Sequence, residues 1–298
     1  MSVVIWRFVD GKAGHDAQSQ GLVAALQEQL AVSVFDIPVN RYVSGFWSWL
    51  TAGYRPGRGL PAPDLLLGAG HATHWHLLAA RRRWGGRIVL LMKPTLPVSW
   101  FDLCLVPEHD GLPPVANVVT THGVLNPLRA GGEHAADTGL ILLGGPSRHF
   151  KWRDSDILSQ LEQLVRQRPV KRWLLTTSPR TPDSLLQALV ERPELECTAY
   201  SSGDRDWLPG RLAEVGEAWV TEDSVSMIYE ALTAGTRVGL LRVKRSQHNR
   251  VTAGIDTMVK EGWVGAPGQL RLAAGPDRPL NEAQRCADWI NEHWLINN

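Results

Sequence analysis

Short apolar runs alternate along the chain with longer segments in which apolar residues recur every three to four positions. In the first half the apolar runs predict strands at 3–9, 32–37, 65–68, 87–91, 103–106 and 117–120. The longer segments predict helices at 17–30 and 74–83. Strands that alternate with helices are typical of parallel sheets with crossover helices, so the pattern predicts an α/β protein.

The alternation starts again after residues 128–137, a small, polar stretch that contains glycine and has little to bury. The strands predicted beyond it are 139–143, 173–176, 195–200, 218–220 and 238–241. The helices predicted between them are 155–168, 182–191, 212–215, 224–234 and 248–260. Such a stretch is typical of a linker, which favours two Rossmann-like domains at 1–130 and 138–275.

The last segment, 281–295, predicts an amphipathic helix that needs a partner surface. Its apolar residues recur at helical spacing: Ala283, Cys286, Ala287, Ile290 and Trp294. Charged residues occupy the other positions, as on a helix with one buried face.

Composition narrows the function classes. With 31 Lys and Arg against 30 Asp and Glu the net charge is +1, so we expect no nucleic-acid partner. The three cysteines form no C-x-x-C pair, which favours a reducing, cytoplasmic compartment. We expect no signal peptide and no membrane-spanning helix, because no apolar run reaches about 18 residues.

One apolar cluster, Phe46 to Leu50 with Trp47 and Trp49, has two interpretations. Tryptophans usually fill cores, and that is the simpler account. The alternative is an exposed apolar patch that faces a lipid-linked substrate.

The strongest chemical signal is a strand that ends in Thr221–Ser224 and leads directly into a helix. Free backbone amides at 224–226 could hold a diphosphate above the sheet, with Ser224 and Ser226 in that turn. Glu230 follows about one and a half turns into the helix, where a carboxylate could accept bonds from both ribose hydroxyls. The alternative is a capped helix, with Asp223 or Ser224 as the cap and Glu230 solvated.

A polar cluster at 242–250 opens the next helix of the same sheet. It contains three groups suited to sugar hydroxyls and phosphate: Gln247, Asn249 and Arg250. The alternative interpretation is a solvated basic loop.

The run from Thr221 to Gly235 resembles the donor site of GT-B glycosyltransferases, such as the lipid-linked N-acetylglucosaminyltransferase of peptidoglycan synthesis. The resemblance implies that Glu230 holds the donor ribose. Thr236 and Arg237 depart from the small residue and proline that follow the glycine in that group.

A wider resemblance covers nearly the whole chain. It is carried by Asp10, Gly11, Lys12, Gly14, His15, Gln18, Ser19, Gly21, Gly144, Gly145, Pro146, Thr176, Thr177, Ser178, Arg180, Thr181, Pro182, Thr221, Asp223, Ser224, Ser226 and Met227. Together these residues resemble the plant mitochondrial-fission proteins of the elongated-mitochondria type and their bacterial relatives, which are GT-B-like. The resemblance implies two domains facing a cleft, with a C-terminal helix at 280–298 that returns to the N-terminal domain.

The loop from Asp10 to His15 follows the first strand, and its spacing matches neither a dinucleotide nor a P-loop fingerprint. In GT-B enzymes a glycine-rich loop here meets the acceptor, which assigns Gly14 to acceptor binding. An imidazole can take up a proton near neutral pH, so His15 is the candidate base and Asp10 its orienting partner. Lys12 could contact an anionic acceptor or be solvated, and His15 could instead cap the helix or bind substrate.

Two further loops follow the first two strands of the second half. They carry Gly144, Gly145 and Ser147 in one, and Thr177, Ser178 and Arg180 in the other. Ligands of open α/β sheets bind at such carboxyl ends of strands. Glycine lets the backbone approach a phosphate closely, and the hydroxyl groups and Arg180 can contact the remaining phosphate oxygens. The alternative is that the glycines form only a turn.

No metal or cofactor is predicted besides the donor substrate. His74 and His76 are two positions apart, cannot share a helix face, and have no carboxylate or cysteine beside them or His71.

The predicted function is glycosyl transfer from a nucleotide diphosphate sugar to an acceptor, with an envelope glycolipid and peripheral contact with the inner membrane expected for a bacterial chain. The alternative is a non-catalytic adaptor with the same fold, as the fission relatives imply, so enzymatic activity stays open. An NAD-dependent epimerase is disfavoured because the dinucleotide fingerprint and a Y-x-x-x-K pair are missing.

Overall fold

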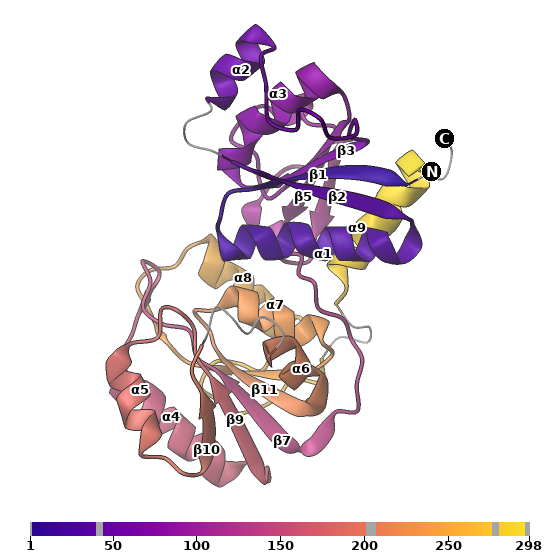
Figure 1. Ribbon diagram of the computed structural model, residues 1–298. Coiled ribbons are helices and arrows are strands. Elements are labelled where there is room, and N and C mark those ends of the chain that lie inside the picture. The colour runs from indigo at the N-terminus through magenta and orange to yellow at the C-terminus, as the bar shows by residue number, and fades with distance from the viewer. Residues whose placement is uncertain (1, 40–43, 201–206, 276–279, 296–298) are drawn as a thin grey trace. The chain divides into compact units, whose positions relative to one another are not determined.

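The computed structural model describes residues 2–39, 44–200, 207–275 and 280–295. The chain divides into two compact units (Figure 1). One consists of Met1–Pro127 with Asn281–Asn298, and the other consists of Leu128–Leu280. Each unit contains a parallel sheet with helices between most successive strands, so the predicted α/β class with two Rossmann-like domains is confirmed.

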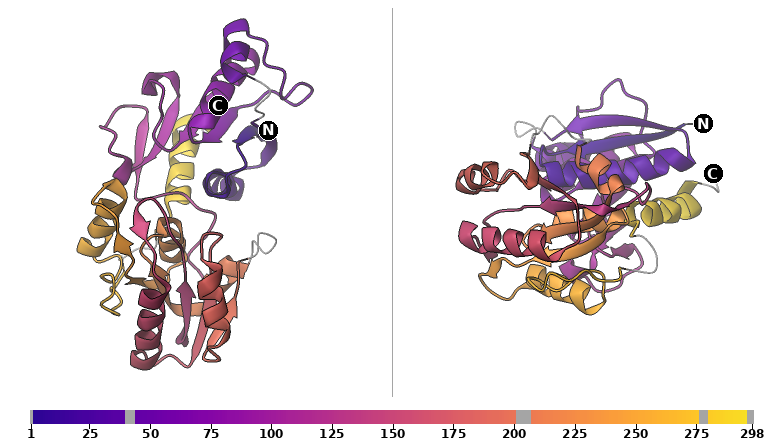
Figure 2. Two further views of the ribbon diagram at one scale, coloured as in Figure 1. Left: turned by 90° about the vertical axis from the view of Figure 1, so that its left-hand side faces the viewer. Right: turned by 90° about the horizontal axis from the view of Figure 1, so that it is seen from below.

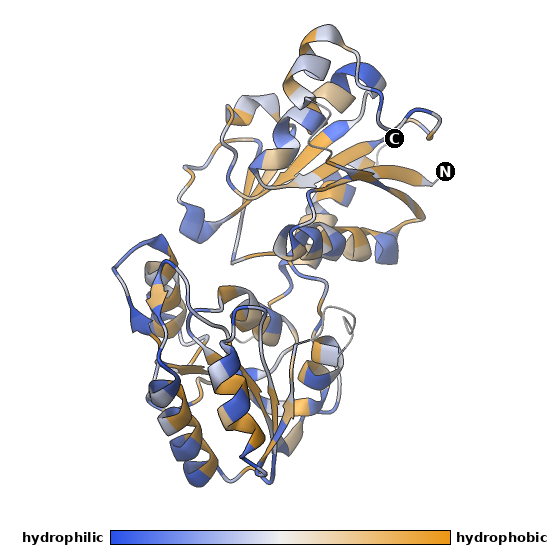
Figure 3. Ribbon diagram, turned by 60° about the vertical axis from the view of Figure 1, so that its left-hand side comes forward, coloured by the Kyte–Doolittle hydropathy of each residue, from blue (hydrophilic) through white to orange (hydrophobic). Residues whose placement is uncertain are grey.

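The first unit is built on a six-stranded sheet in the order β2-β1-β3-β4-β5-β6. Its strands are β1 (Val3–Val9), β2 (Val32–Pro38), β3 (Leu65–Ala69), β4 (Arg87–Leu91), β5 (Leu103–Pro107) and β6 (Val118–Thr121). Every residue of β3 and β5 is buried, as expected for parallel strands covered on both faces. Figure 3 shows these strands as mostly hydrophobic, with polar residues concentrated on helices and loops.

Two hydrophobic cores lie on opposite faces of this sheet, since neighbouring strand residues such as Ile5 and Trp6 point to opposite sides. Helices α1 (Ala13–Gln29) and α9 (Glu282–Ile290) cover the Ile5 face. Helix α3 (His74–Trp84) covers the Trp6 face, and the short helix α2 (Gly45–Thr51) packs on α3.

The C-terminal helix returns to the first unit, as predicted. Cys286, Ala287 and Ile290 of α9 lie in one core with Leu22 and Leu26 of α1, and Figure 1 shows the two helices side by side. A five-residue π-helical turn, Asn291–Leu295, extends α9. The partner surface that the amphipathic pattern required is therefore α1 and the sheet behind it.

The second unit has a five-stranded parallel sheet in the order β10-β9-β7-β11-β12, and Figure 2 shows it from two further sides. Its strands are β7 (Ala135–Leu142), β9 (Arg172–Thr176), β10 (Leu195–Thr198), β11 (Val215–Thr221) and β12 (Arg237–Leu241). Its helices are α4 (Asp154–Gln167), α5 (Asp183–Val190), α6 (Trp207–Glu214), α7 (Val225–Thr233) and α8 (Arg250–Lys260). A small antiparallel pair, β8 (Phe150–Lys151) with β13 (Lys244–Arg245), joins two of its loops.

Three elements show where the sequence prediction was incomplete. Strand β7 begins at Ala135, inside the predicted linker, because Ala135 pairs with Val215 of β11. The first residues of this strand are exposed and have no apolar pattern, so the sequence did not predict them as a strand. Helix α6 spans Trp207–Glu214 rather than 212–215. Helix α2 was not predicted, since seven residues are too short to show helical periodicity.

Gly21 tests the packing of α1. A methyl group at Gly21 would lie 2.5 Å from the backbone carbonyl of Asn126, whereas a methyl group at Gly14 would have no heavy atom within 4 Å. We expect Gly21→Ala to lower the free energy of unfolding by about 1–3 kcal/mol, although alanine favours an isolated helix. Gly14→Ala, the matched control, should lose no stability in the same urea titration. Equal stability of the two variants would contradict the packing argument.

Candidate functional site

Each sheet has one point at which the strand order reverses, and ligands of open α/β sheets bind at the carboxyl ends of the strands there. In the first unit this point lies between β1 and β3. Asp10 follows β1 and Gly70 follows β3. In the second unit it lies between β7 and β11, which Gly144 and Glu222 follow closely.

The structure brings the predicted residues of the first loop together. The His15 Nδ1 lies 2.9 Å from Asp10 Oδ2, and the Lys12 backbone N–H donates to Asp10 Oδ1 over 3.2 Å. Burial alone would raise the pKa of Asp10, but the bonds from Lys12 and His15 outweigh it and hold that pKa below its ordinary value. An ionised Asp10 can only accept this hydrogen bond, so in the neutral imidazole the proton lies on Nδ1 and Nε2 is left as an acceptor.

Gly70 holds the other side of the His15 ring and was not singled out in the sequence. A methyl group at Gly70 would overlap the His15 ring at Cε1, and the Gly70 φ of +77° also requires glycine. The available signal was a glycine directly after a buried strand. His15 is therefore positioned by Asp10 and Gly70 at the end of the sheet.

Gly144 and Gly145 in the second unit have a packing role, because both of their backbone N–H groups have partners within the protein. The Gly144 N–H donates to Thr221 Oγ1 over 2.7 Å, and the Gly145 N–H donates to Asp223 Oδ2 over 2.9 Å. Added methyl groups at Gly144 and Gly145 would overlap the Asp223 carboxylate and the Arg180 carbonyl oxygen respectively. Both N–H groups are thus used within the protein.

Arg180 and Asp223 join the loops that follow β7, β9 and β11. Arg180 donates to the Gly145 carbonyl oxygen over 2.7 Å, and its other terminal nitrogen lies 2.9 Å from Asp223 Oδ2. Burial raises the pKa of Asp223, and the Gly145 N–H and the Arg180 charge offset only part of this effect. Within the described part of the chain, Asp223 Oδ1 has no hydrogen-bond partner. The sequence had suggested Asp223 as a helix cap and as one of the residues that carry the family resemblance, without a role in joining loops.

The neighbouring hydroxyl groups are also used for loop structure. Thr177 Oγ1 accepts the Tyr200 N–H, and Ser178 forms a closed turn with Thr181. Thr177 and Ser178 are both buried. Ser147 is exposed and forms a turn with Phe150. These contacts assign Thr177 and Ser178 to holding the loop rather than to presenting free hydroxyls.

The N-terminus of α7 has open backbone donors, but one position differs from the prediction. The Ser224 N–H donates to the Thr221 carbonyl oxygen over 3.0 Å, so it is not free. Ser224 makes no side-chain cap, and the first N–H groups inside the helix, from Val225 to Met227, have no acceptor within the helix. Ser226 among them is exposed. The open donors lie one residue further along than predicted.

Glu230 lies in the second turn of α7 and is partly exposed. Burial raises the pKa of its carboxyl from an ordinary value of 4.5 to about 7. Within the described residues its carboxylate has no hydrogen-bond or ion-pair partner. A partly enclosed carboxyl group without a partner destabilises a folded protein, and such groups cluster at functional sites.

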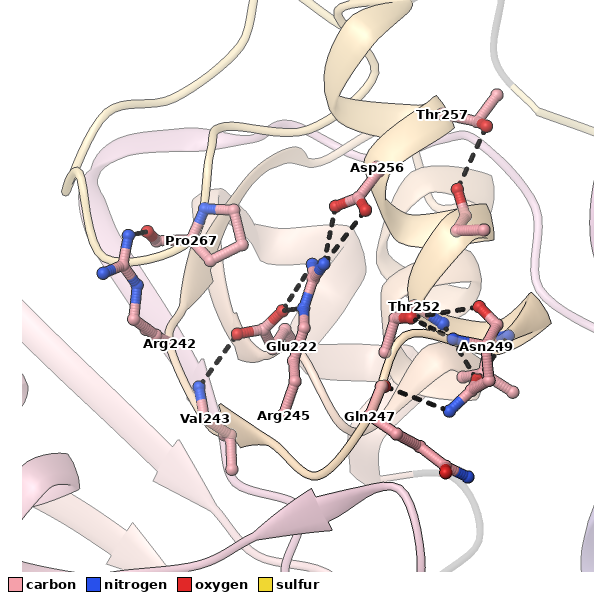
Figure 4. A network of polar contacts seen from close by, with 12 residues as sticks. Glu222, Arg242, Val243, Arg245, Gln247, Asn249, Thr252, Asp256, Thr257 and Pro267 are labelled. Atoms are coloured by element: carbon pink, nitrogen blue, oxygen red, sulfur yellow. Dashed lines mark hydrogen bonds and ion pairs between the residues drawn. The ribbon is translucent and has the colours of Figure 1, made fainter.

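The loop after β12 is held by a buried carboxylate, and Figure 4 shows its contacts. Glu222 accepts the Val243 N–H over 3.0 Å and lies 2.8 Å from Arg245, which also contacts Asp256. Burial raises the pKa of Glu222, and the charge of Arg245 opposes that rise. This buried pair, which the sequence did not reveal, fixes the loop that contains Gln247.

Asn249, which was predicted to contact the donor, is the cap of α8. Its side chain accepts the N–H groups of Val251 and Thr252, and Thr252 accepts the Asn249 N–H in return. Figure 4 shows this reciprocal contact. Gln247 and Arg250 are exposed on either side of the cap.

The three histidines near β3 do not form a cluster. The His74 Nδ1 lies 3.2 Å from Thr95 Oγ1, and His76 Nδ1 lies 3.2 Å from the Tyr54 hydroxyl. Burial lowers the pKa of His74 to about 4, with the charge of His71 as a smaller cause. Among the residues that the structure describes, no group of three potential ligands could hold a metal ion.

The two doubly wound units define an α/β protein of the GT-B-like fold class. The chain belongs to the family described as mitochondrial fission ELM1, whose model matches residues 13–294. No curated protein matches the sequence. In the described ranges, no helix is long and apolar enough to cross a membrane.

Solved structures similar to the chain include nucleotide-sugar proteins. A protein of Listeria monocytogenes proposed to be a UDP-N-acetylglucosamine 2-epimerase has a TM-score of 0.61 and 12% identity, with 100% of this chain and 98% of that chain covered. MurG of Acinetobacter baumannii has a TM-score of 0.55 and 13% identity, with 97% of this chain and 99% of that chain covered. The UDP-GlcNAc 2-epimerase of Neisseria meningitidis, bound to UDP-GlcNAc, has a TM-score of 0.55 and 13% identity, with 100% of both chains covered. At these identities the likeness establishes the fold.

The contact between Arg180 and Asp223 can be tested by stability. Arg180→Met leaves the buried Asp223 carboxylate without its counter-charge, so we expect a loss of about 2–4 kcal/mol in the free energy of unfolding. Asp223→Asn in the same chain should recover part of that loss. Arg172→Met, which breaks an exposed pair with Glu196, is the matched control and should change the urea midpoint far less. An equal effect of the two arginine substitutions would refute the role of Arg180.

Proposed function

We propose that the chain binds a nucleotide diphosphate sugar in its second unit and transfers the sugar to an acceptor hydroxyl. The observation that carries the proposal is the Glu230 carboxylate, which is partly buried and unpaired in the described chain, behind an uncapped helix N-terminus. Two ribose hydroxyls would supply the hydrogen bonds that this carboxylate lacks. The N–H groups from Val225 to Met227 would receive the diphosphate.

The groups around this turn support a nucleotide rather than a bare anion. Glu222 and Asp223, which precede α7, are both buried and paired with arginines, Glu222 with Arg245 and Asp223 with Arg180. These ion pairs fix the position of the turn that leads into α7. The α7 helix then places Glu230 about one and a half turns, or roughly 7–8 Å, beyond its first N–H groups. A diphosphate joined to ribose spans a comparable length.

The proposed base is His15 of the first unit. As the acceptor oxygen forms a bond to the anomeric carbon, Nε2 of His15 would take the acceptor proton, and the bond from that carbon to the diphosphate oxygen would break. Asp10, 2.9 Å from Nδ1, would stabilise the imidazolium that results. The nucleoside diphosphate leaves with both electrons of the broken bond, and the α7 N-terminus would stabilise its charge.

The adaptor interpretation is the second candidate, and the family description, mitochondrial fission, favours it. A thermal-shift panel of nucleotide diphosphate sugars on the full chain separates the two, because a ligand that binds the folded state raises its melting temperature. A shift with at least one donor, followed by release of the free nucleoside diphosphate on turnover, supports transfer. No shift with any donor overturns the proposal and leaves the adaptor.

Glu230→Gln should weaken binding of uridine diphosphate, measured by calorimetry, by about tenfold or more, because the amide has one neutral acceptor oxygen where the carboxylate has two charged ones. Glu261→Gln changes an exposed glutamate at the end of α8, so it is the matched control and should bind uridine diphosphate like the parent. Unchanged affinity of Glu230→Gln would remove Glu230 from the site.

The same substitution should stabilise the unliganded protein in a pH-dependent way. Because the folded pKa of Glu230 is raised from 4.5 to about 7, stability falls as pH rises through that interval. The destabilisation of the folded protein is absent below pH 4.5 and complete above pH 7, where it amounts to about 3 kcal/mol. The Glu230→Gln variant should therefore have a higher melting temperature than the parent at about pH 8 and the same melting temperature at about pH 4, measured at a pH where both proteins are still folded. Equal melting temperatures at about pH 8 would contradict the unpaired carboxylate.

His15→Asn tests the base, since asparagine can still donate to Asp10 but lacks the Nε2 acceptor. We expect turnover to fall by about 10²–10⁴-fold with donor affinity unchanged. His293→Gln, which changes an exposed histidine of the C-terminal turn, is the control and should retain full turnover. Loss of donor affinity in His15→Asn would instead assign His15 to binding.

A further inference from the structure

A second surface of the first unit lies on α2, on the outer side of its packing with α3. In this helix Phe46 is 40% exposed, Trp47 62% and Leu50 49%. The other large apolar residues exposed in the described chain are scattered singly: Val115, Val190 and Tyr200. Large apolar side chains that gather on one short helix mark an interaction surface, whereas single ones need no explanation.

The inner side of α2 is fixed by aromatic packing, so the outer side is presented in a defined orientation. Phe46 and Trp49 lie 4.9 and 5.4 Å from Trp75 of α3 between ring centroids, and Trp49 stacks on Trp100 at 6.0 Å. Gly45 lets the helix approach, since a methyl group there would lie 2.8 Å from Trp75 Cβ. Trp47 and Leu50, three residues apart, point away from this packing.

The segment that contains α2 is rich in basic residues although the whole chain is nearly neutral, and one of them, Arg81, is paired with Asp102. From Ser44 to Trp100 the only acidic residue is Asp64, against seven basic ones: Arg55, Arg58, Arg81, Arg82, Arg83, Arg87 and Lys93. Asp64 accepts the Val4 N–H over 2.7 Å, and α2 itself has no charged residue. Arg82 lies 5.8 Å from the centre of a Trp49 ring, and the exposed Arg55 follows the helix closely. We call Phe46, Trp47, Leu50, Arg55 and Arg82 the α2 surface.

We propose that the α2 surface docks on the face of an anionic lipid bilayer. Tryptophan and phenylalanine favour the headgroup region, where their rings meet acyl chains, and arginine pairs with lipid phosphate. The combination of uncharged aromatic residues with a rim of arginines matches such a surface in both polarity and charge. This inference concerns α2 alone and does not rest on donor binding by the second unit.

Sedimentation of the full chain with lipid vesicles tests the proposal. Vesicles of phosphatidylcholine with about 30% phosphatidylglycerol should sediment the protein, and pure phosphatidylcholine should sediment much less. The double variant Trp47→Gln with Leu50→Gln should lower the partition coefficient by about tenfold or more. Val190→Gln, which removes an apolar side chain 82% exposed in the second unit, is the control and should bind like the parent.

The contribution of the arginines to vesicle binding is tested by separate substitutions. Arg55→Gln with Arg82→Gln should weaken binding to the anionic vesicles, and Arg237→Gln with Lys260→Gln, which change exposed basic residues of the second unit, should not. Circular dichroism and uridine diphosphate affinity of each variant report the fold and the donor site separately.

Three outcomes would overturn the proposal. In the first, the parent stays in the supernatant with both vesicles. In the second, the Trp47 and Leu50 variant sediments as the parent does. In the third, that variant instead loses self-association in gel filtration, which would make the α2 surface a protein interface.

Discussion

Parallel strand pairing is the constraint on which the candidate sites depend. Because every strand in both main sheets runs the same way, the loops that follow the strands of a sheet all emerge at one edge. At the β1/β3 and β7/β11 boundaries the chain continues in opposite directions across the sheet, so the neighbouring loops separate. Asp10 and Gly70 lie at one such boundary, and Gly144 and Asp223 lie at the other. The pairing therefore decides which polar residues meet, before any side chain is considered.

Which of those residues are open to a ligand is decided by hydrogen bonding. The amides of Gly144 and Gly145, and the side chain of Asn249, already have partners in the protein. Burying their polar groups then costs little free energy, since each bond offsets the loss of water. Glu230 differs, because its raised pKa reflects burial without a compensating bond. The donor proposal rests on that difference between satisfied and unsatisfied groups.

The first unit combines two features with separate physical origins. His15 is positioned by a carboxylate and by the absence of a side chain at Gly70, an arrangement that controls one proton. The α2 surface arises from aromatic packing on α3, which leaves Trp47 and Leu50 outside. A transfer enzyme with a lipid acceptor would use both, whereas an adaptor would need only the second. The two proposals can accordingly fail independently.

The sequence by itself determined the α/β class, the strand positions in the first unit and the amphipathic C-terminal helix, because periodicity records which faces are buried. It also indicated the Asp10 to His15 loop and the helix that contains Glu230. Only the tertiary structure decided that β7 starts at Ala135 and that the glycines after β7 pack against Asp223 and Arg180. Those outcomes depend on contacts between residues up to about 80 positions apart, such as Gly145 with Asp223, and local sequence patterns contain no information about such partners.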